Sequence, residues 1–268
     1  MTEVLINGRV DDRVPADDRG LLYGDCLFET IGFRAGVAPL WSWHWQRLTE
    51  SSARLGLVVP DEDIALDECR QLAGNARCVI RLTLTRGSGG RAYEPPAEPD
   101  CRRIVHRRDW PARIGQQRDR GVRVVTSPIH LAGHSLLAGM KHGNRLEQVL
   151  AAKDCRERSV EEALMLDASG NLVEAIASNV IVVIEGRALT PRVEGAGVAG
   201  VGLAWLRSQP EVALESATIN RHDMNRAEEV MMINSVAGIR PVMAVDDRAL
   251  DVGKICRTWQ RLWTERID

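Results

Sequence analysis

The lysine at position 141 stands where a generic surface charge is not expected. The chain has 35 lysines and arginines, and only three of these are lysines, at positions 141, 153 and 254. Lys141 follows the apolar segment 136–140 and precedes a Gly-Asn break, whereas Lys153 lies among charged residues. Burial lowers the pKa of an ammonium group and frees its amine as a nucleophile, which Schiff-base formation requires. The alternative is a loop lysine whose stem packs on apolar groups while its ammonium stays in water.

Two further features lie downstream of Lys141. Glu174 is the only charged residue between positions 171 and 184, and a carboxylate in such an apolar stretch needs a positive partner, such as a protonated pyridine nitrogen. The string GAGVAGVGLAWL, residues 195–206, is a glycine-rich turn entering a helix, and its N–H groups can hold a phosphate. Such turns are common and do not identify a ligand alone. Together, an amine, a carboxylate and a phosphate cradle are the groups that hold pyridoxal 5′-phosphate (PLP).

Composition sets the class of protein. The 268 residues suffice for one large domain or two modest ones with a buried core. A net charge of −2 does not indicate a nucleic-acid or membrane partner, although local arginines can still bind an acidic substrate. The N-terminal string MTEVLINGRVDDR has no signal-peptide pattern, the apolar runs are too short to span a membrane, and the six cysteines form no CxxC pair. We therefore expect a cytoplasmic protein with reduced thiols and no metal site.

We expect an α+β chain with two domains, each with a mixed sheet and helices: a smaller N-terminal domain over residues 1–113 and a larger, PLP-binding C-terminal domain over 114–268. Alternation and turn residues predict strands, and 3.6-residue periodicity predicts helices. The strands expected are 4–7, 27–34, 37–40, 78–85, 102–106, 122–126, 163–166, 180–184, 188–190, 212–219, 230–234 and 241–245. The helices expected are 41–57, 60–72, 144–158, one from about 203, and 252–265. Segment 111–121 is predicted to be irregular, and Asn144 is predicted to cap the helix that follows it, with Glu147 completing a capping box.

Several strings spread along nearly the whole chain resemble the fold-type IV PLP enzymes, the class IV aminotransferase family. These strings are LINGR, DRGLLYGDCLFET, HWQRL, RGSGGRAY, LAGMKHGNRLEQVLA, EALMLDASGNLVEAIASNVIV, GVAGV and INSVAGIRPV. The pattern K-x-x-N-R-L-E-Q-V-L from Lys141 and the pattern R-G-S-G-G-R-x-Y from Arg86 are most similar to the aminodeoxychorismate lyases within that family. The other strings occur across the family.

The resemblance implies a role for each matching position. Lys141 matches the lysine that binds the cofactor aldehyde covalently and acts as catalytic base, and Glu174 matches the carboxylate on the pyridine nitrogen. Arg47, in HWQRL, matches the arginine on the cofactor phosphate, a bidentate task that suits a guanidinium, although a solvated helix face would equally explain an arginine there. The other cofactor-binding positions lie against the phosphate or the ring and are Val198, Val201, Gly202 and Ser235.

The resemblance also implies a reaction, in which 4-amino-4-deoxychorismate yields 4-aminobenzoate and pyruvate for folate precursor synthesis. Its substrate carries two carboxylates, and the candidate substrate-binding residues are Tyr23, Arg91, Tyr93 and Arg107. By residue type alone these are also ordinary surface arginines and core or rim tyrosines. One alternative is a D-amino-acid or related class IV aminotransferase, and another is a PLP-binding protein without activity. Since the relatives are homodimers, a homodimer is expected.

Three positions depart from the family pattern. Cys26, in YGDCLFE, stands where glycine is usual, and His142-Gly143 replaces a more usual apolar second residue in the lysine string. Gly202 ends the phosphate turn where aminotransferases often have threonine, which leaves only a backbone donor. These departures affect the active-site wall and the phosphate cradle, but they remove none of the groups that hold PLP.

Overall fold

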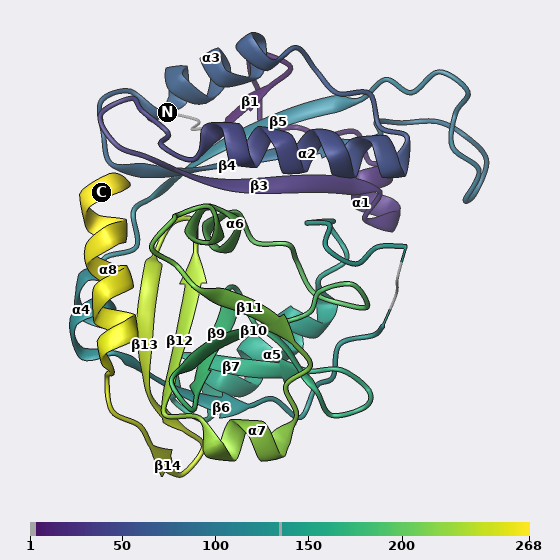
Figure 1. Cartoon of the computed structure of the whole chain (residues 1–268). Coiled ribbons are helices and arrows are strands. Elements are labelled where there is room, and N and C mark those ends of the chain that lie inside the picture. The colour runs from purple at the N-terminus through teal and green to yellow at the C-terminus, as the bar shows by residue number, and fades with distance from the viewer. Residues whose placement is uncertain (1–3, 134–135) are drawn as a thin grey trace. The chain divides into compact units, whose positions relative to one another are not determined.

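The computed structural model describes residues 4–133 and 136–268 of the chain (Figure 1). Its elements are a mixture of helices and strands, which confirms the expected α+β class. The chain divides into two compact units. Unit 1 contains Met1–Trp110 and Met140–Asn144, and unit 2 contains Pro111–Gly139 and Arg145–Asp268. The short segment around Lys141 therefore belongs to unit 1, although the residues on both sides of it belong to unit 2.

Unit 1 is built on an antiparallel sheet in the order β2-β1-β5-β4-β3. The strands are β1 (Val4–Ile6), β2 (Arg9–Val10), β3 (Cys26–Phe33), β4 (Cys78–Thr85) and β5 (Arg102–Asp109). Its helices are α1 (Arg19–Tyr23), α2 (Trp41–Leu55) and α3 (Glu62–Ala73). Helix α2 buries Trp41, His44 and Leu48, whose spacing of three and four residues places them on one face. Gly56, with a φ of 64°, ends this helix in the left-handed conformation that glycine adopts without strain.

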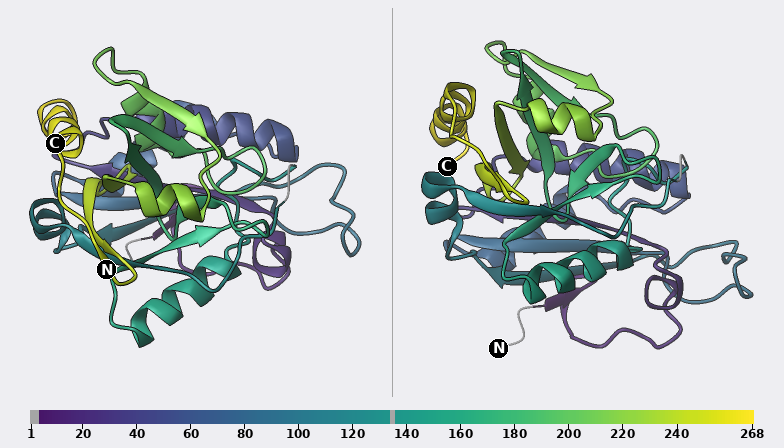
Figure 2. Two further views of the ribbon diagram at one scale, coloured as in Figure 1. Left: turned by 60° about the horizontal axis from the view of Figure 1, so that its bottom comes forward. Right: turned by 90° about the horizontal axis from the view of Figure 1, so that it is seen from below.

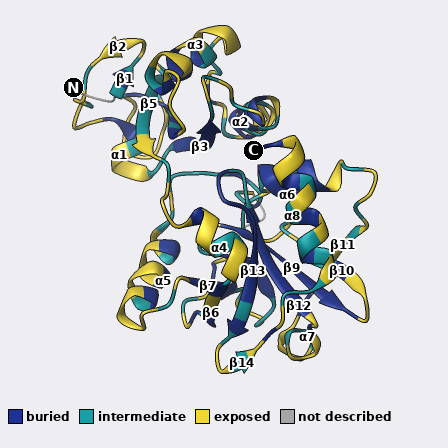
Figure 3. Cartoon of the chain, turned by 90° about the vertical axis from the view of Figure 1, so that its left-hand side faces the viewer, coloured by how far each residue is buried: buried dark blue, intermediate teal, exposed yellow. Residues whose placement is uncertain are grey.

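Unit 2 contains a mixed sheet in the order β11-β10-β9-β12-β13-β6-β7-β8, with β14 paired to β13. Its strands are β6 (Val122–Thr126), β7 (Glu162–Leu166), β8 (Leu172–Ala175), β9 (Asn179–Ile184), β10 (Arg187–Pro191), β11 (Leu214–Ala217), β12 (Glu229–Asn234), β13 (Gly238–Val245) and β14 (Arg248–Ala249). Its helices are α4 (Ile114–Arg120), α5 (Leu146–Glu157), α6 (Val201–Arg207), α7 (Arg221–Arg226) and α8 (Lys254–Arg266). Helix α8 packs on β13, as Figures 1 and 2 show. Strand β9 is buried along its whole length, so its run of apolar residues lies inside the unit (Figure 3).

Three local predictions were wrong. Residues 37–40 do not form a strand, because a single bridge between Arg34 and Val37 closes a tight turn and α2 then begins at Trp41. Segment 111–121 is not irregular, since residues 114–120 form α4. Asn144 does not cap α5, which starts two residues later without a side-chain cap.

Asn144 has a tertiary contact instead of a capping role. A Cβ atom added to Gly24 would overlap the Asn144 amide oxygen, so the two residues lie in close contact within unit 1. The side chain that the sequence assigned to a helix end thus packs against the loop before β3. Within residues 4–133 and 136–268, no helix is both long and apolar enough to cross a lipid bilayer.

Candidate active site

The segment that carries Lys141 pairs with the edge of strand β3. The Phe28 N–H donates to the Lys141 carbonyl at 2.9 Å, and the Gly143 N–H donates to the Cys26 carbonyl at 3.0 Å. Leu27 and His142 form the antiparallel bridge between these two bonds. Because β3 is the last strand of its sheet, its outer edge is available for this pairing. Backbone hydrogen bonds therefore fix where the Lys141 side chain begins.

The ring of Phe28 lies close to two cations. The Lys141 Nζ atom is 4.6 Å from the ring centroid, and the Arg81 Cζ atom is 3.7 Å from it. Both distances are within the range of a cation–π interaction. Lys141 is only partly exposed. Its ammonium therefore lies against an aromatic ring in unit 1, as a lysine extended into bulk water would not.

Arg47 forms a buried ion pair with Glu29. Its Nε donates to Glu29 Oε1 at 2.8 Å and its Nη2 donates to Oε2, a two-point contact between planar groups. Glu29 is 2% exposed, and burial alone would raise its pKa. Arg47 and His44 together outweigh burial and lower the pKa of Glu29 to about 2. The carboxylate is therefore ionised at neutral pH and holds the guanidinium in a fixed orientation.

His44 is the second partner of Glu29. Its Nδ1 lies 2.6 Å from Glu29 Oε2, and burial lowers its pKa, an effect to which the positive charges of Arg47 and Lys141 add. The ring is therefore neutral, donates from Nδ1 and carries its lone pair on Nε2. That Nε2 atom is buried and has no hydrogen-bond partner among the described residues. Unit 1 thus brings Arg47, Glu29, His44 and Lys141 into one electrostatic neighbourhood.

The four candidate substrate-binding residues all belong to unit 1 but lie in different parts of it. Tyr23 and Tyr93 contact each other, with ring centroids 5.5 Å apart, and Tyr93 is 84% exposed. Arg91 is in the same exposed loop as Tyr93, between β4 and β5. Arg107 lies on β5 in register with Ile80, whereas Phe28 is in register with Thr83 on β4. Since side chains alternate along a strand, Arg107 points to the opposite sheet face from Phe28.

Unit 2 holds Glu174 and Val198 together. The Val198 N–H donates to Glu174 Oε2 at 2.8 Å, and the carboxylate is 4% exposed on β8. Gly197, with a φ of 86°, lets the turn approach this closely, because a Cβ there would lie 2.7 Å from Val173 Cγ1. Gly139, two residues before Lys141 in the chain, is tied to the same turn through Gly197 and Ala199, by bonds of 2.9 Å each. The carboxylate and the glycine-rich turn thus form one local structure.

Asn179 fixes the turn from the other side. Its Nδ2 donates to the Val198 carbonyl at 2.9 Å. A Cβ on Gly200 would overlap the Asn179 side-chain oxygen, so glycine is required at the start of α6. This amide therefore hydrogen-bonds to Val198 and packs closely against Gly200, two residues later and just before the helix.

The first turn of α6 lies against the turn between β12 and β13. A Cβ on Gly202 would lie 3.0 Å from the Asn234 carbonyl carbon and 3.2 Å from the Ser235 nitrogen. The Asn234 side chain in turn accepts from the N–H groups of Val236 at 3.0 Å and Ala237 at 2.6 Å. A threonine at position 202 would need this backbone to shift by a few tenths of an ångström, so the turn is closely fitted to glycine. The first N–H groups of a helix have no acceptor within it, so those of Val201 and Gly202 suit an anion.

The departure at Cys26 lies against the one at His142-Gly143. Gly143 faces the Cys26 side chain, and a Cβ at position 143 would overlap Cys26 Sγ. Cys26 is 7% exposed, and burial raises the pKa of its thiol to about 11. The sulfur of one residue therefore occupies the room that the other leaves empty.

Comparison with known proteins identifies the family. The class IV aminotransferase pattern matches residues 26–245. The chain belongs to this family. An aminodeoxychorismate lyase from Vibrio harveyi is 30% identical over 264 residues, 95% of this chain and 97% of the relative. A putative branched-chain-amino-acid aminotransferase from Methanocaldococcus jannaschii is 29% identical over 274 residues, 95% of this chain and 93% of the relative.

A solved structure supports the same grouping. The crystal structure of 4-amino-4-deoxychorismate lyase from Pseudomonas aeruginosa has a TM-score of 0.93 and 37% identity, and covers 99% of both chains. The family resemblance and the fold-type IV architecture expected from the sequence are thereby confirmed. Members of this family use PLP, so the expected cofactor is also confirmed.

The residues present fit PLP. Taken by itself, unit 1 has an amine at Lys141 and an oriented guanidinium at Arg47, groups of the kind that PLP binds. Unit 2, taken by itself, has the Glu174 carboxylate and a glycine turn leading into a helix, closely packed at Gly197 and Gly202. Glu29, His44 and Asn179 were missed as supporting residues. Glu29 carried a usable signal, because it is a lone carboxylate in an apolar strand, as Glu174 is.

Proposed function

We propose that this enzyme is an aminodeoxychorismate lyase, which converts 4-amino-4-deoxychorismate to 4-aminobenzoate and pyruvate. The observation that carries the proposal is the 37% identity and 0.93 TM-score to a 4-amino-4-deoxychorismate lyase over 99% of both chains. The position of Lys141 against Phe28 supports it, because the reaction needs a lysine amine held in one place.

In the proposed reaction each residue has a distinct task. Bound PLP supplies an electron sink for the charge left when the substrate loses a proton. Lys141 first holds the cofactor and then, as a free amine, takes the proton from the substrate carbon that bears nitrogen. Glu174 keeps the cofactor's ring nitrogen protonated. The bond between the substrate ring and the enolpyruvyl oxygen then breaks, and the substrate ring becomes aromatic. The enolpyruvate that leaves takes up a proton and becomes pyruvate.

The phosphate is the anchor of the cofactor in this proposal. Arg47 contacts it with a guanidinium that Glu29 orients, while the backbone at Val201 and Gly202 donates N–H groups. Val198 packs on the ring, and Ser235 supplies a hydroxyl to the phosphate. These contacts would keep the cofactor ring fixed while the Lys141 amine acts on the substrate.

We assign the substrate carboxylates to the exposed loop of unit 1. Arg91 supplies positive charge, and Tyr23 and Tyr93 supply aromatic surface and hydroxyl groups for the substrate ring. Arg107 is the weaker candidate, because its side chain points to the opposite sheet face from the Phe28 ring that Lys141 contacts.

The 29% identity to a putative aminotransferase makes transamination the second candidate function. The two differ in stoichiometry, because an aminotransferase stores the amino group on the cofactor and needs a keto acid to continue. With aminodeoxychorismate as sole substrate, 4-aminobenzoate and pyruvate are expected in equal amounts over many turnovers. Lys141→Ala is the control and is expected to give neither product. Turnover that stops after one equivalent and resumes on adding a keto acid would establish the aminotransferase instead.

A further inference from the structure

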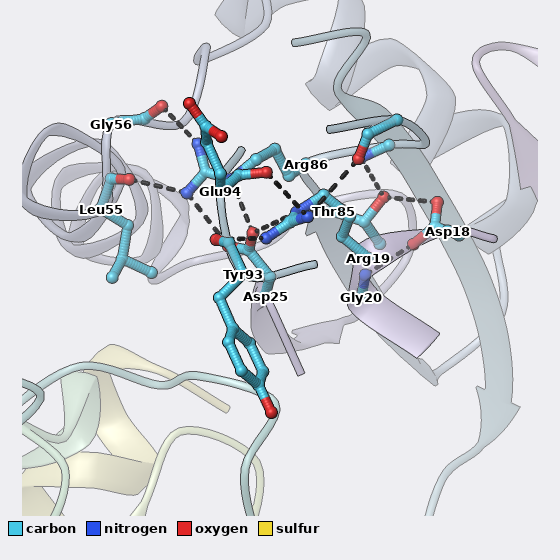
Figure 4. A network of polar contacts seen from close by, with 12 residues as sticks. Asp18, Arg19, Gly20, Asp25, Leu55, Gly56, Thr85, Arg86, Tyr93 and Glu94 are labelled. Carbon is cyan, nitrogen blue, oxygen red and sulfur yellow. Dashed lines mark hydrogen bonds and ion pairs between the residues drawn. The ribbon is translucent and has the colours of Figure 1, made fainter. Parts of the chain in front are cut away.

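One buried arginine donates hydrogen bonds to several backbone carbonyls of an exposed loop. Arg19 is 4% exposed at the start of α1 (Figure 4). Its Nη1 donates to the carbonyls of Ala92 at 2.9 Å, Glu94 at 3.3 Å and Gly89 at 3.4 Å, and its Nη2 donates to the Tyr93 carbonyl at 3.0 Å. Four carbonyl groups from six consecutive positions therefore converge on one guanidinium about 70 residues earlier in the chain.

The charge of Arg19 is balanced by a shared carboxylate. Asp25 Oδ2 accepts from Arg19 Nε at 3.1 Å and from Arg86 Nε at 2.6 Å. Arg86 also donates to the Leu55 and Gly56 carbonyls at 2.8 and 2.9 Å, at the end of α2, as Figure 4 shows. A cation there is favoured by the helix dipole. Arg19 is thus fixed to the body of unit 1 through Asp25 while it holds the loop.

Among the described residues, loop 89–94 has few other contacts that fix its conformation. Residues 89–95 are all exposed, so few buried apolar contacts order them. Within the loop, the Arg91 and Glu94 backbones exchange hydrogen bonds of 3.1 and 3.0 Å. Ala92 has a φ of 51°, a conformation that is uncommon for a residue other than glycine. Hydrogen bonds to Arg19 are therefore the main connection between this turn and the rest of the unit.

The same arginine contacts the aromatic pair. Its Cζ atom is 4.9 Å from the Tyr23 ring centroid, and the Tyr23 ring contacts the Tyr93 ring. The Arg19 guanidinium therefore contacts the face of the Tyr23 ring and the backbone carbonyl of Tyr93.

We propose that Arg19 is a positioning residue that holds loop 89–94 in its substrate-binding conformation and so sets where Tyr93 and Arg91 meet the substrate. The substrate part of this inference rests on the proposed function, whereas the ordering of the loop does not. An arginine is required because its planar fork offers five N–H donors, whereas a lysine offers three on a single atom. Arg19→Lys keeps the positive charge beside Asp25 and removes the fork.

The chain has only two tyrosines, and both lie in this contact, so 3-fluorotyrosine labelling gives two ¹⁹F signals that report on it. In the holoenzyme, Arg19→Lys is expected to shift and broaden both signals. The matched control is Arg102→Lys, because Arg102 pairs with Asp18 in the same network and donates no hydrogen bond to loop 89–94 in the described structure. This control is expected to leave both signals in place. Unchanged signals in Arg19→Lys overturn the proposal.

Kinetics test the substrate part. In Arg19→Lys the KM for aminodeoxychorismate is expected to rise about tenfold or more, with kcat and cofactor absorbance nearly unchanged. If the signals move but KM does not, the loop does not serve the substrate and the proposal is wrong. If the wild type forms no 4-aminobenzoate, the proposed function fails, while the ¹⁹F comparison still decides whether Arg19 orders the loop.

A second variant covers the case in which Arg19→Lys does not fold. A Cβ on Gly90 would overlap the Glu94 carbonyl oxygen, so Gly90→Ala disturbs the same turn and leaves Arg19 intact. Gly90→Ala is expected to move both ¹⁹F signals and to raise KM in the same sense. A KM equal to that of the wild type in this variant, with the signals moved, contradicts the proposal.

Discussion

Gly143 and Cys26 are expected to be energetically coupled. In Gly143→Ala the new methyl group would overlap Cys26 Sγ and would also lie 3.3 and 3.4 Å from the Gly24 oxygen and Cα. The backbone at Gly143 has no positive φ, so alanine is not strained there for conformational reasons. The cost is therefore steric, and overpacking of this kind destabilises by about 1–3 kcal/mol.

The double-mutant cycle separates this steric cost from other effects. Cys26→Gly removes the sulfur that Gly143 faces, at its own cost of about 1–2 kcal/mol for a lost buried side chain and a glycine in a strand. In that background the sulfur clash is absent, and Gly143→Ala is expected to cost less than about 0.5 kcal/mol, since alanine also reduces the entropy of the unfolded chain. The expected coupling energy is thus about 1–3 kcal/mol.

Urea unfolding of the wild type, the two single variants and the double variant measures all four free energies. The absorbance of the bound cofactor should rank the four proteins in the same order as their free energies of unfolding. The reason is that Gly143 is two residues from Lys141 on the segment that pairs with β3. Additive effects, within about 0.5 kcal/mol, would refute the idea that Cys26 and Gly143 compensate each other.

Four further predictions address the site and the assembly. Lys141→Ala is expected to abolish covalent cofactor binding, whereas Lys153→Ala, at a position 62% exposed, is expected to change the free energy of unfolding by less than about 0.5 kcal/mol. Borohydride reduction and peptide mapping locate the lysine that binds the cofactor, and a pyridoxyl label on a lysine other than Lys141 contradicts the assignment. Glu174→Gln should keep the fold and reduce turnover more than PLP affinity, and a normal rate would exclude Glu174 as the partner of the ring nitrogen. Burial lowers the pKa of His44 below 6.5, so the unfolded chain binds this proton more readily than the folded chain. The free energy of unfolding should therefore fall as the pH falls below about 6.5, by up to about 1.4 kcal/mol per pH unit. In His44→Asn this dependence of the free energy of unfolding on pH should be weaker between pH 6.5 and 5, above the window in which Glu29 titrates, and an equal dependence in urea unfolding would argue against it. Light scattering at micromolar concentration is expected to give a homodimer, and a monomer alone would contradict that expectation.

Much of the fold was predictable from periodicity and turn residues. The bounds expected for the strands 78–85 and 122–126 match β4 and β6, because alternating or β-branched runs there end at charged or glycine-containing turns. Lys141 and Glu174 could be selected as candidates from the sequence because each is a charge in an apolar segment, and their roles stay predictions. The role of Asn144 was not predictable, because its contact with Gly24 joins positions 120 residues apart, and a local capping pattern cannot reveal such a contact.

Pairings between distant segments limited the prediction of the site. The HWQRL string identified Arg47, but its ion pair with Glu29 requires α2 to lie on β3 with Glu29 pointing toward the helix. Likewise, nothing in the sequence around Arg19 indicates that its partners are carbonyl groups at positions 89–94. Main-chain acceptors are present at every residue, so they leave no mark on the sequence.

The assignment of Met140–Asn144 to unit 1 bears on how the gene can be divided. A fragment ending at residue 110 would lack the segment that bonds to the outer edge of β3, and an uncovered edge strand invites pairing with other chains. Residues 1–110 therefore do not form a self-contained domain that recombination could exchange between enzymes. The five residues that complete it include Lys141, the lysine we propose as catalytic, so any exchange of this half that kept its own edge intact would have to carry that lysine with it.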